Sequence, residues 1–344
     1  MQRESDVHYP SEPLPVSPHS VNPRLRFLRS IGDGNVSYDQ LLAFDREMAR
    51  AAIEPFSNPQ GKTETLLAKV ASRLHLMWNL HRSSKGPIFV SFMGYSEYRI
   101  MPFSYGTEII PYCFDCWPEL YERWLSFFKR HRVRFAFFSA RQSALHFAKA
   151  LPSMKSVWLP EACDPFDYRP SKPWLERSID VLEFGRKNEI YHARIMEPLA
   201  RANKVHLYVR IKGQTTFSDS SREAFLEGLG ESKISICFPS SQTHPERAGS
   251  IETVTHRYFQ SMASKCLLLG HAPQELVDLF GYNPVIEVQQ GDEFAQIESL
   301  LNTPNSHRDS IEKNYKRLLE VGTEKYRIDT LLRVLRDVAM LSCS

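Results

Sequence analysis

Residues 179–211 read IDVLEFGRKNEIYHARIMEPLARANKVHLYVRI, and the spacing of their apolar side chains changes twice. Positions 179–184 form a short, mostly apolar run, which is typical of a buried strand. Positions 188–202 carry apolar residues at helical spacing, and a second apolar run covers 205–211. Two such runs separated by one helix predict a strand–helix–strand unit with parallel strands.

The same alternation extends over most of the chain. Strands are expected at 24–28, 87–92, 108–112, 133–138, 156–159, 234–238, 266–269 and 285–288. Helices are expected at 37–56, 62–80, 118–129, 141–150, 221–229, 250–264, 273–280, 291–302, 306–321 and 324–340. We therefore predict an α/β protein with two Rossmann-like, doubly wound domains that face each other across a cleft.

Proline-rich stretches set the expected boundaries. Residues 1–24 hold five prolines among polar residues and are expected to be extended or disordered. The first domain should cover 25–160, a proline-rich linker 161–177, and the second domain 178–322. The helix in 323–344 is amphipathic, so crossing back to the first domain and packing on its own domain both remain open.

Composition limits the function. The 344 residues carry 43 basic and 40 acidic side chains, a net charge of +3, which gives no field that would favour nucleic acid as a partner. Six cysteines are too few for a disulfide framework, and Cys113 with Cys116 lacks two further ligands for zinc. No signal peptide or apolar run of membrane-spanning length is evident, so the expected location is the cytoplasm.

In parallel sheets, ligands bind beyond the carboxyl ends of strands. Gly185, Arg186 and Lys187 follow the strand 179–184 and precede a helix, an arrangement that suits a diphosphate. An ordinary tight turn with two solvated bases is the alternative. No dinucleotide or P-loop glycine motif is present.

A second candidate is the polar loop 239–249 with the helix expected at 250–264. On that helix, Glu252, His256 and Gln260 would form one polar stripe, with Thr253 and Arg257 beside it. Carboxylate and amide groups suit a hydroxyl-rich ligand. The alternative is a solvated helix face.

The segment from Arg257 to Leu269, RYFQSMASKCLLL, resembles a motif of the GT-B-fold nucleotide-sugar glycosyltransferases of the "group 1" type. Its pattern runs R-x-F-E-x-x-A-x-G before an apolar strand. Further similar stretches are 274–276, 279–288, the interdomain 159–164 and Tyr112 to Trp117. This sequence departs from the motif at Gln260, where the family has glutamate, and at Lys265, where it has glycine.

The resemblance implies a transferase that moves a sugar from a nucleotide-diphosphate sugar, bound in the second domain, to a glycan, glycolipid or other acceptor bound in the first. It also implies retention of configuration, no cofactor and no metal, and no Asp-x-Asp pair is found in a suitable loop. A role in surface-polysaccharide or glycolipid synthesis would place the protein at the inner face of a membrane as a peripheral partner. The implied donor-binding residues are Gly185, Arg186, Lys187, Arg210, Lys212, Glu252, Arg257 and Gln260.

Catalytic roles are expected for Asp115 and Glu252, with Glu246 as another candidate for the first acidic position. Acceptor contacts are expected from Tyr95, Glu97 and Arg99, which follow the strand 87–92. A helix cap for Asp115 and a surface loop for Glu97 are the alternatives. A catalytically weakened relative that binds a nucleotide sugar or a partner, a sugar epimerase and a small-molecule binding protein also remain open.

Overall fold

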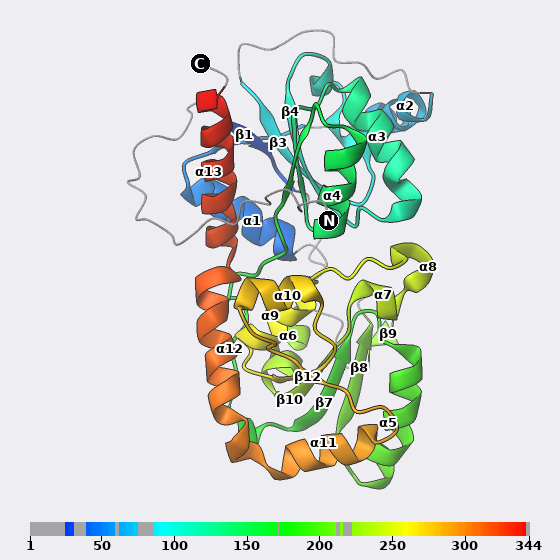
Figure 1. Cartoon of the computed structure of the whole chain (residues 1–344), viewed down its shortest axis with the longest axis vertical. Helices are drawn as coiled ribbons and strands as arrows, with labels where there is room; N and C mark the ends of the chain where they lie inside the picture. The colour runs from blue at the N-terminus through cyan, green and yellow to red at the C-terminus, as the bar shows by residue number, and fades with distance from the viewer. Residues whose placement is uncertain are drawn as a thin grey trace, which may run out of the picture.

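The computed structural model contains two α/β lobes stacked along the long axis of the molecule (Figure 1). It describes residues 25–30, 39–58, 62–74, 86–170, 172–210, 214–215 and 222–341. The expected N-terminal segment 1–24 and Lys212 lie outside these residues. Each lobe is built on a sheet whose main strands are parallel, so the predicted pair of Rossmann-like units is confirmed.

The N-lobe sheet has the strand order β2-β1-β3-β4-β5-β6, and all of its neighbouring strands are parallel. Its strands are β1 (Arg26–Leu28), β2 (Glu54–Phe56), β3 (Ile88–Met93), β4 (Ile109–Phe114), β5 (Phe135–Phe138) and β6 (Lys155–Trp158). The two central strands, β3 and β4, are buried over almost their whole length, which explains their continuous apolar sequence.

Helices cover both faces of this sheet. One face packs on α3 (Tyr121–Arg130) and α4 (Arg141–Ala150) through a cluster that includes Trp124, Phe128 and Phe147. The other face packs on α1 (Asp39–Arg50) and on α13 (Glu324–Leu341), the last helix of the chain. The N-lobe also contains α2 (Lys62–Arg73) and the 3₁₀ turns η2 (Glu97–Ile100), η3 (Phe103–Tyr105) and η4 (Pro118–Leu120).

The C-lobe sheet has the order β12-β11-β10-β7-β8-β9, and β9 alone pairs antiparallel among the described strands. Its strands are β7 (Ile179–Phe184), β8 (His206–Arg210), β9 (Gln214–Thr215), β10 (Ser232–Cys237), β11 (Leu267–Gly270) and β12 (Ile286–Glu287). Strands β7 and β8 pair in parallel with Glu183 opposite Tyr208. The strand–helix–strand unit predicted from residues 179–211 is thus present at the centre of this lobe.

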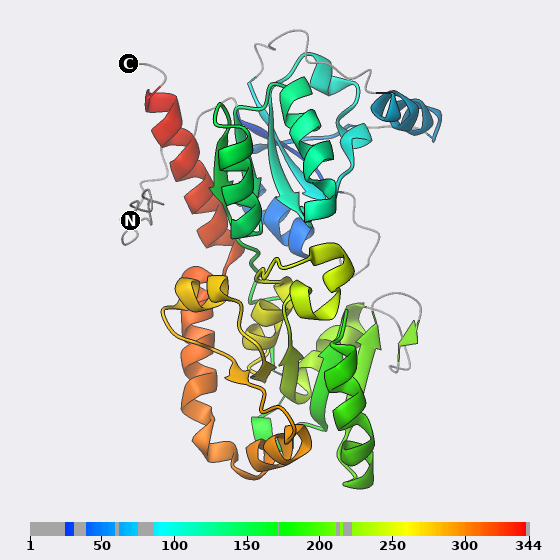
Figure 2. The same ribbon diagram turned by 45° about the vertical axis from the view of Figure 1, so that its right-hand side comes forward.

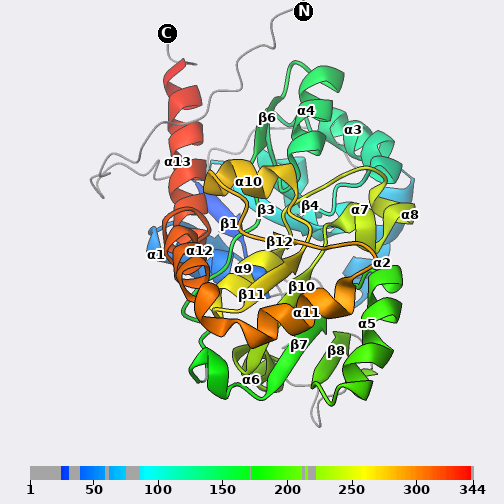
Figure 3. The ribbon, with the colours of Figure 1, turned by 60° about the horizontal axis from the view of Figure 1, so that its bottom comes forward.

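The C-lobe core also has two sides. Apolar residues of α5 (Glu189–Arg201) and α11 (Glu293–Asn302) cover one face of the sheet (Figure 3). Helices α6 (Arg222–Gly230), α9 (His256–Ala263) and α10 (Gln274–Phe280) cover the other. The remaining C-lobe elements are η5 (Trp174–Glu176), α7 (Ser240–Thr243), α8 (Pro245–Ala248), η6 (Pro304–Ser306) and α12 (Arg308–Val321).

The chain passes between the lobes twice, and the two passages lie side by side. Cys163 in the first passage forms a parallel bridge with Thr323 in the second, and its amide donates to the carbonyl of Gly322 at 3.1 Å. Arg327, a fully buried side chain of α13, donates to the carbonyls of Pro160 and Glu161 at 2.8 and 3.1 Å. The final helix therefore packs on the N-lobe, next to the linker.

Two predicted helices are wrong in their extent, and the last part of a third, expected at 62–80, lies outside the described residues. The helix expected at 37–56 ends at Arg50 and is followed by β2, a short strand whose first two residues are exposed. The helix expected at 250–264 begins only at His256. Within the described residues, no helix has the length and apolar character needed to cross a bilayer.

Candidate active site between the lobes

The turn after β7 is built around Gly185, whose φ of +72° is a left-handed conformation that glycine adopts without strain. A Cβ at this position would lie 3.0 Å from Nη2 of Arg257. Helix α5 follows, and the side chain of its N-cap, Asn188, accepts a hydrogen bond from the amide of Tyr191 at 3.1 Å. The turn therefore leads directly into a well-formed helix N-terminus.

Arg257 joins α9 to this turn. Its Nη2 donates to the main-chain oxygen of Arg186 at 2.6 Å, and its guanidinium lies 5.5 Å from the ring centre of Phe184. The structure thus brings together three of the residues predicted to bind the donor, namely Gly185, Arg186 and Arg257. They come from two elements more than 70 positions apart along the chain.

A third arginine, Arg247 on α8, belongs to the same group. The evidence is His244, whose pKa is lowered from 6.5 to about 4 by burial and by the positive charges of Arg186, Arg247 and Arg257. Three guanidinium groups near one neutral imidazole place positive charge in this part of the C-lobe, and Asp115, Glu246 and Glu119 offset part of it. Such an arrangement favours a bound anion.

Asp115 approaches the same arginines from the N-lobe. It follows β4 directly and has a φ of +49°, which is rare outside glycine and better tolerated by Asp and Asn than by most side chains. Burial raises the pKa of its carboxyl, while the charges of Arg186 and Arg247 act to lower it. The carboxyl ends of β4 and β7 therefore face each other, as two opposed parallel sheets require. Asp115 does not cap the next turn, because Trp117 occupies that position.

Two further carboxyl groups, for which the sequence pattern suggests no role, lie close by. Burial, with the charge of Asp115, raises the pKa of Glu161 to about 8, and its Oε2 accepts from the amide of His256. Burial also raises the pKa of Glu275 to about 7. Glu275 accepts from the amides of Arg141 and Val254 at 2.5 and 3.3 Å. Glu275 thus ties the C-lobe to the first turn of α4 in the N-lobe.

Glu252 lies at the contact between the lobes, although not on a helix as predicted. It belongs to the segment 251–255, which is neither helix nor strand, and its amide donates to Oε1 of Gln142 at 2.8 Å. One carboxylate oxygen lies 3.7 Å from Nε2 of His271, at the end of β11. The predicted polar stripe of Glu252, His256 and Gln260 is therefore wrong, because only the last two share the helix.

Gln260 forms a hydrogen bond with Tyr168. It is 4% exposed, and its Nε2 donates to the hydroxyl of Tyr168 at 3.0 Å. That hydroxyl donates in turn to Asp39 of α1 at 3.2 Å, and Arg222 of α6 pairs with the same carboxylate at 2.8 Å. In this structure Gln260 thus belongs to a polar network that joins the lobes, and donor contact by Gln260 stays a prediction.

Lys265 has a φ of +53°, the left-handed conformation in which the related motif has glycine. Its Nζ pairs with Glu312 of α12 at 2.7 Å and lies 4.7 Å from the ring centre of Tyr315. The backbone requirement that explains a glycine is therefore kept in this chain. The lysine side chain is directed to α12, not toward the arginines.

The expected acceptor residues contact their own lobe. Burial opposes ionisation of Glu97, but hydrogen bonds from His131, Tyr95 and Arg130 outweigh it and lower the pKa to about 2. Arg99 donates to the carbonyl of Ser91 at 3.0 Å. These contacts place Glu97 in a buried ion-pair network, so its role toward an acceptor remains a prediction.

Two donor candidates remain. Lys187 follows β7, and Arg210 is the last residue of β8. Lys187 pairs with Glu189 at 3.2 Å, and its Nζ lies 4.7 Å from the ring centre of Tyr208. Arg210 ends β8, but the structure describes only its main chain. These two contacts of Lys187 do not join it to the three arginines.

No family model and no curated protein matches the sequence. Several solved structures are similar. Sucrose-phosphate synthase from Thermosynechococcus elongatus aligns with a TM-score of 0.59 at 9% identity, over 93% of this chain and 100% of that chain. An α-glucosyltransferase in complex with UDP and a 13-mer DNA containing an HMU base aligns with a TM-score of 0.57 at 10% identity, over 91% and 99%.

HepE from Anabaena, in complex with UDP-glucose, aligns with a TM-score of 0.54 at 10% identity, over 91% of this chain and 99% of that chain. All three neighbours align over nearly their full length and are glycosyltransferases of GT-B type. The chain therefore has the GT-B fold that the motif around Arg257 predicted.

Proposed function

We propose that this protein is a glycosyltransferase that moves a sugar from a nucleotide-diphosphate sugar to an acceptor. One observation carries the proposal. Arg186, Arg247 and Arg257 gather at the carboxyl end of β7, where Asp115 of the opposite lobe approaches them. A GT-B neighbour is solved with UDP-glucose and another with UDP, which supports a nucleotide-sugar donor.

The donor side can stabilise a leaving diphosphate through fixed positive groups. Negative charge grows on the diphosphate as the bond to the sugar breaks. The guanidinium groups and the amides at the start of α5 are already in place to stabilise that negative charge. We therefore propose that transfer proceeds without a metal on the diphosphate, and that configuration is retained as in the related motif family.

On the acceptor side, Asp115 is the best-placed carboxylate to orient a hydroxyl group. It lies at the lobe contact, close enough to Arg186 for the two charges to interact. The raised pKa of Glu161, about 8, keeps a neutral carboxyl next to it that can donate a hydrogen bond. Glu252 keeps its proposed place near the sugar, since it borders the same lobe contact.

A glycolipid acceptor is supported by α2, which projects from the N-lobe in Figure 2. Leu66, Leu67 and Leu74 of this helix region are 62%, 63% and 62% exposed, and Lys69 and Arg73 lie among them. An apolar helix face with cations is the pattern of peripheral binding to anionic membranes. Flotation with anionic vesicles tests this: a Leu66→Ser/Leu67→Ser variant should bind less than Leu319→Ser, a matched exposed leucine on α12.

One neighbour is bound to DNA, so the small net charge of this chain does not rule out a nucleic-acid acceptor for the fold. The acceptor screen therefore includes duplex DNA beside glycans and glycolipids. Transfer to DNA alone would overturn the proposed acceptor class while leaving the donor proposal intact.

A second candidate function is a weakened relative that binds a nucleotide sugar without transferring it. The burial of Gln260 against Tyr168 favours it, because the related motif has a glutamate here. Hydrolysis or transfer from a bound donor separates the two functions. Binding without turnover, with every acceptor class tried, would support the second.

The donor proposal is tested by thermal shift with UDP, GDP, CMP and dTDP and their sugars, because a ligand that binds only the folded state raises Tm. Arg186→Ala should reduce the shift, since removing one charge-assisted contact weakens binding by about tenfold or more. Arg194→Ala is the matched control, because this arginine of α5 pairs with Glu293 instead. Equal shifts in both variants would overturn the assignment.

A further inference from the structure

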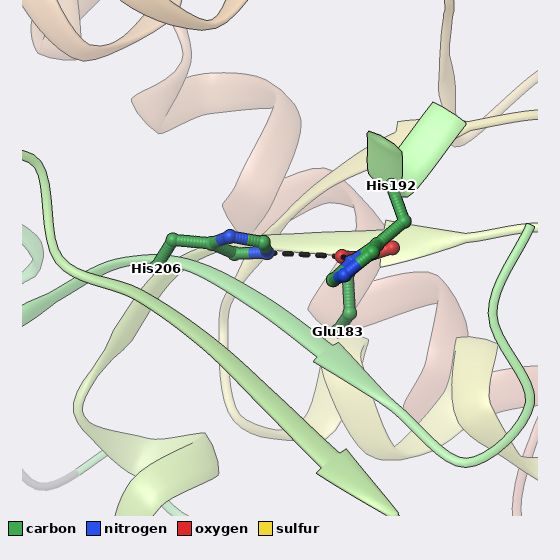
Figure 4. Close-up of side chains that lie close together, drawn as sticks. All are labelled: Glu183, His192 and His206. Atoms are coloured by element: carbon green, nitrogen blue, oxygen red, sulfur yellow. Dashed lines mark hydrogen bonds and ion pairs between the residues drawn. The ribbon is translucent and has the colours of Figure 1, made fainter. Parts of the chain in front are cut away.

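Three side chains from consecutive elements of the C-lobe converge on one point (Figure 4). Glu183 is the penultimate residue of β7, His192 lies in the first turns of α5, and His206 begins β8. Oε2 of Glu183 lies 2.5 Å from Nδ1 of His192 and 2.9 Å from Nε2 of His206.

The carboxylate is buried and only half satisfied. Glu183 is 2% exposed, and its second oxygen, Oε1, has no hydrogen-bond partner within the described part of the chain. The two histidine side chains are 13% and 9% exposed. A buried carboxylate oxygen without a partner is costly, and a cation held by both oxygens of Glu183 would remove that cost.

We infer that Glu183, His192 and His206 form a binding site for a divalent transition metal, with Zn²⁺ as the ion that best suits the ligands. Zn²⁺ takes imidazole nitrogen and carboxylate oxygen at about 2.0–2.2 Å. The three ligand atoms lie within 4.8 Å of one another. Bond lengths near 2.1 Å separate tetrahedral ligand atoms by roughly 3.4 Å. The distances of 2.5 and 2.9 Å from the carboxylate to the two imidazole nitrogens would therefore each have to lengthen by less than about 1 Å.

Metal binding changes where the protons sit. Each imidazole binds the ion through the nitrogen that now faces Glu183, so each ring carries its remaining proton on the other nitrogen. Three protein ligands leave one coordination position for water.

The site lies directly behind the turn that carries Arg186. Glu183 precedes Gly185 by two residues, and the hydroxyl of Tyr208 donates to the carbonyl of Gly185 at 3.0 Å. The ring of Tyr208 in turn lies 5.5 Å from that of His192. A metal here would fix β7, α5 and β8 to one another and hold the turn in place. It would brace the donor site without touching the diphosphate.

Zn²⁺ titration of the metal-stripped, tag-free full chain by calorimetry tests the site, with Co²⁺ as a spectroscopic probe. Wild type should bind a single equivalent and show the visible bands of cobalt bound by nitrogen and oxygen. His192→Ala and His206→Ala should weaken binding by about tenfold or more. His271→Ala is the control, because this exposed histidine also lies beside two glutamates, Glu252 and Glu287.

Glu183→Gln keeps the shape of the side chain and an acceptor for both histidines, so it guards against loss of folding. Folded Glu183→Gln, checked by circular dichroism, should bind Zn²⁺ more weakly than wild type. Absence of binding to wild type, or equal affinity in all of these variants, would overturn the site and leave a hydrogen-bonded Glu–His trio. Hydrogen exchange tests the bracing: Zn²⁺ should slow exchange at residues 185–192 in wild type only, and unchanged exchange would refute it.

Discussion

Nη2 of Arg257 donates to the main-chain oxygen of Arg186 at 2.6 Å, so a side chain of α9 holds the turn that follows β7. This hydrogen bond connects two stretches that the sequence marks independently as parts of a donor site. They are the turn at Gly185 and the motif that begins at Arg257. The bond also leaves the Arg186 side chain free to interact with Asp115 across the lobe contact.

Gly185→Ala should reduce both stability and donor binding. Alanine would have to adopt the left-handed backbone of this turn, which is strained for a residue with a Cβ. That Cβ would also lie 3.0 Å from Nη2 of Arg257. We expect the free energy of unfolding to fall by about 1–2 kcal/mol and the Kd for the donor nucleotide to rise about tenfold. Denaturant unfolding and calorimetry measure the two effects.

Gly281→Ala is the control for that variant. Gly281 has a similar φ, +78°, but a Cβ there meets nothing within 4 Å. Its alanine variant should lose about as much stability through backbone strain, with donor affinity unchanged. If Gly185→Ala also binds the donor normally, the contact with Arg257 is irrelevant to the site.

Asp115→Asn should separate catalysis from binding. Asparagine tolerates the left-handed backbone that Asp115 adopts, so the fold is kept. Loss of the carboxylate should lower the transfer rate by about tenfold or more while donor binding stays equal or becomes tighter, because a negative charge opposite the arginines is removed. Initial rates and nucleotide affinity are compared with wild type, and an unchanged rate would exclude a catalytic role.

Replacing Lys265 should show how much its left-handed backbone conformation lowers the stability of the protein. Lys265→Ala loses the ion pair with Glu312 and keeps the left-handed strain, whereas Lys265→Gly loses the pair and removes the strain. The glycine variant should therefore be more stable than the alanine variant by about 1 kcal/mol in chemical denaturation. Equal stabilities would mean that the strain is absorbed elsewhere.

Stability should fall as pH rises from about 7 to about 8. The pKa of Glu161 is raised from 4.5 to about 8, so in this window the folded state holds a proton that the unfolded state has released. One such group contributes at most about 1.4 kcal/mol per pH unit. His256, with its pKa lowered from 6.5 to about 3, acts in the opposite direction but at lower pH.

Glu161→Gln should make that pH dependence shallower. It should not abolish it, because buried Glu324 also has a pKa raised to about 8. The measurement is the free energy of unfolding of wild type and of Glu161→Gln between about pH 7 and pH 8. Identical slopes would show that Glu161 is ionised in the folded protein.

Most of the fold follows from the sequence because the buried strands and amphipathic helices carry strong periodic patterns. The predicted strand 179–184 and helix 141–150 coincide with β7 and α4. The short β2 was missed because the sequence Glu54-Pro55-Phe56 has no alternating or continuous apolar pattern. Two-residue β9 gives no pattern at all.

Helix α9 begins later than the predicted helix 250–264, because contacts with the N-lobe hold residues 251–254 out of the helix. Ile251 packs with Trp117 and Ala140 of the N-lobe. The amide of Glu252 donates to Gln142, and that of Val254 donates to Glu275. Local helical spacing predicts a helix there, and these long-range contacts override it.

The candidate site was predictable only where one element determines it. Arg186 follows from its place after β7, and Arg257 from the motif. Arg247, Glu161 and Glu275 depend on which loops of two lobes meet, which no local pattern reveals. The trio of Glu183, His192 and His206 was missed for the same reason, because its members come from three successive elements at a spacing that matches no metal-binding motif.

The paired crossings at Cys163 and Thr323 have a mechanical consequence. Two chain segments that lie side by side form a natural hinge, so we expect any relative movement of the lobes to be a swing about that line. Residues close to the line, such as Arg327, hardly move during such a swing. Asp115 and Arg186, which belong to different lobes, are separated or brought together by it, and a ligand held between them would set the angle at which the swing stops.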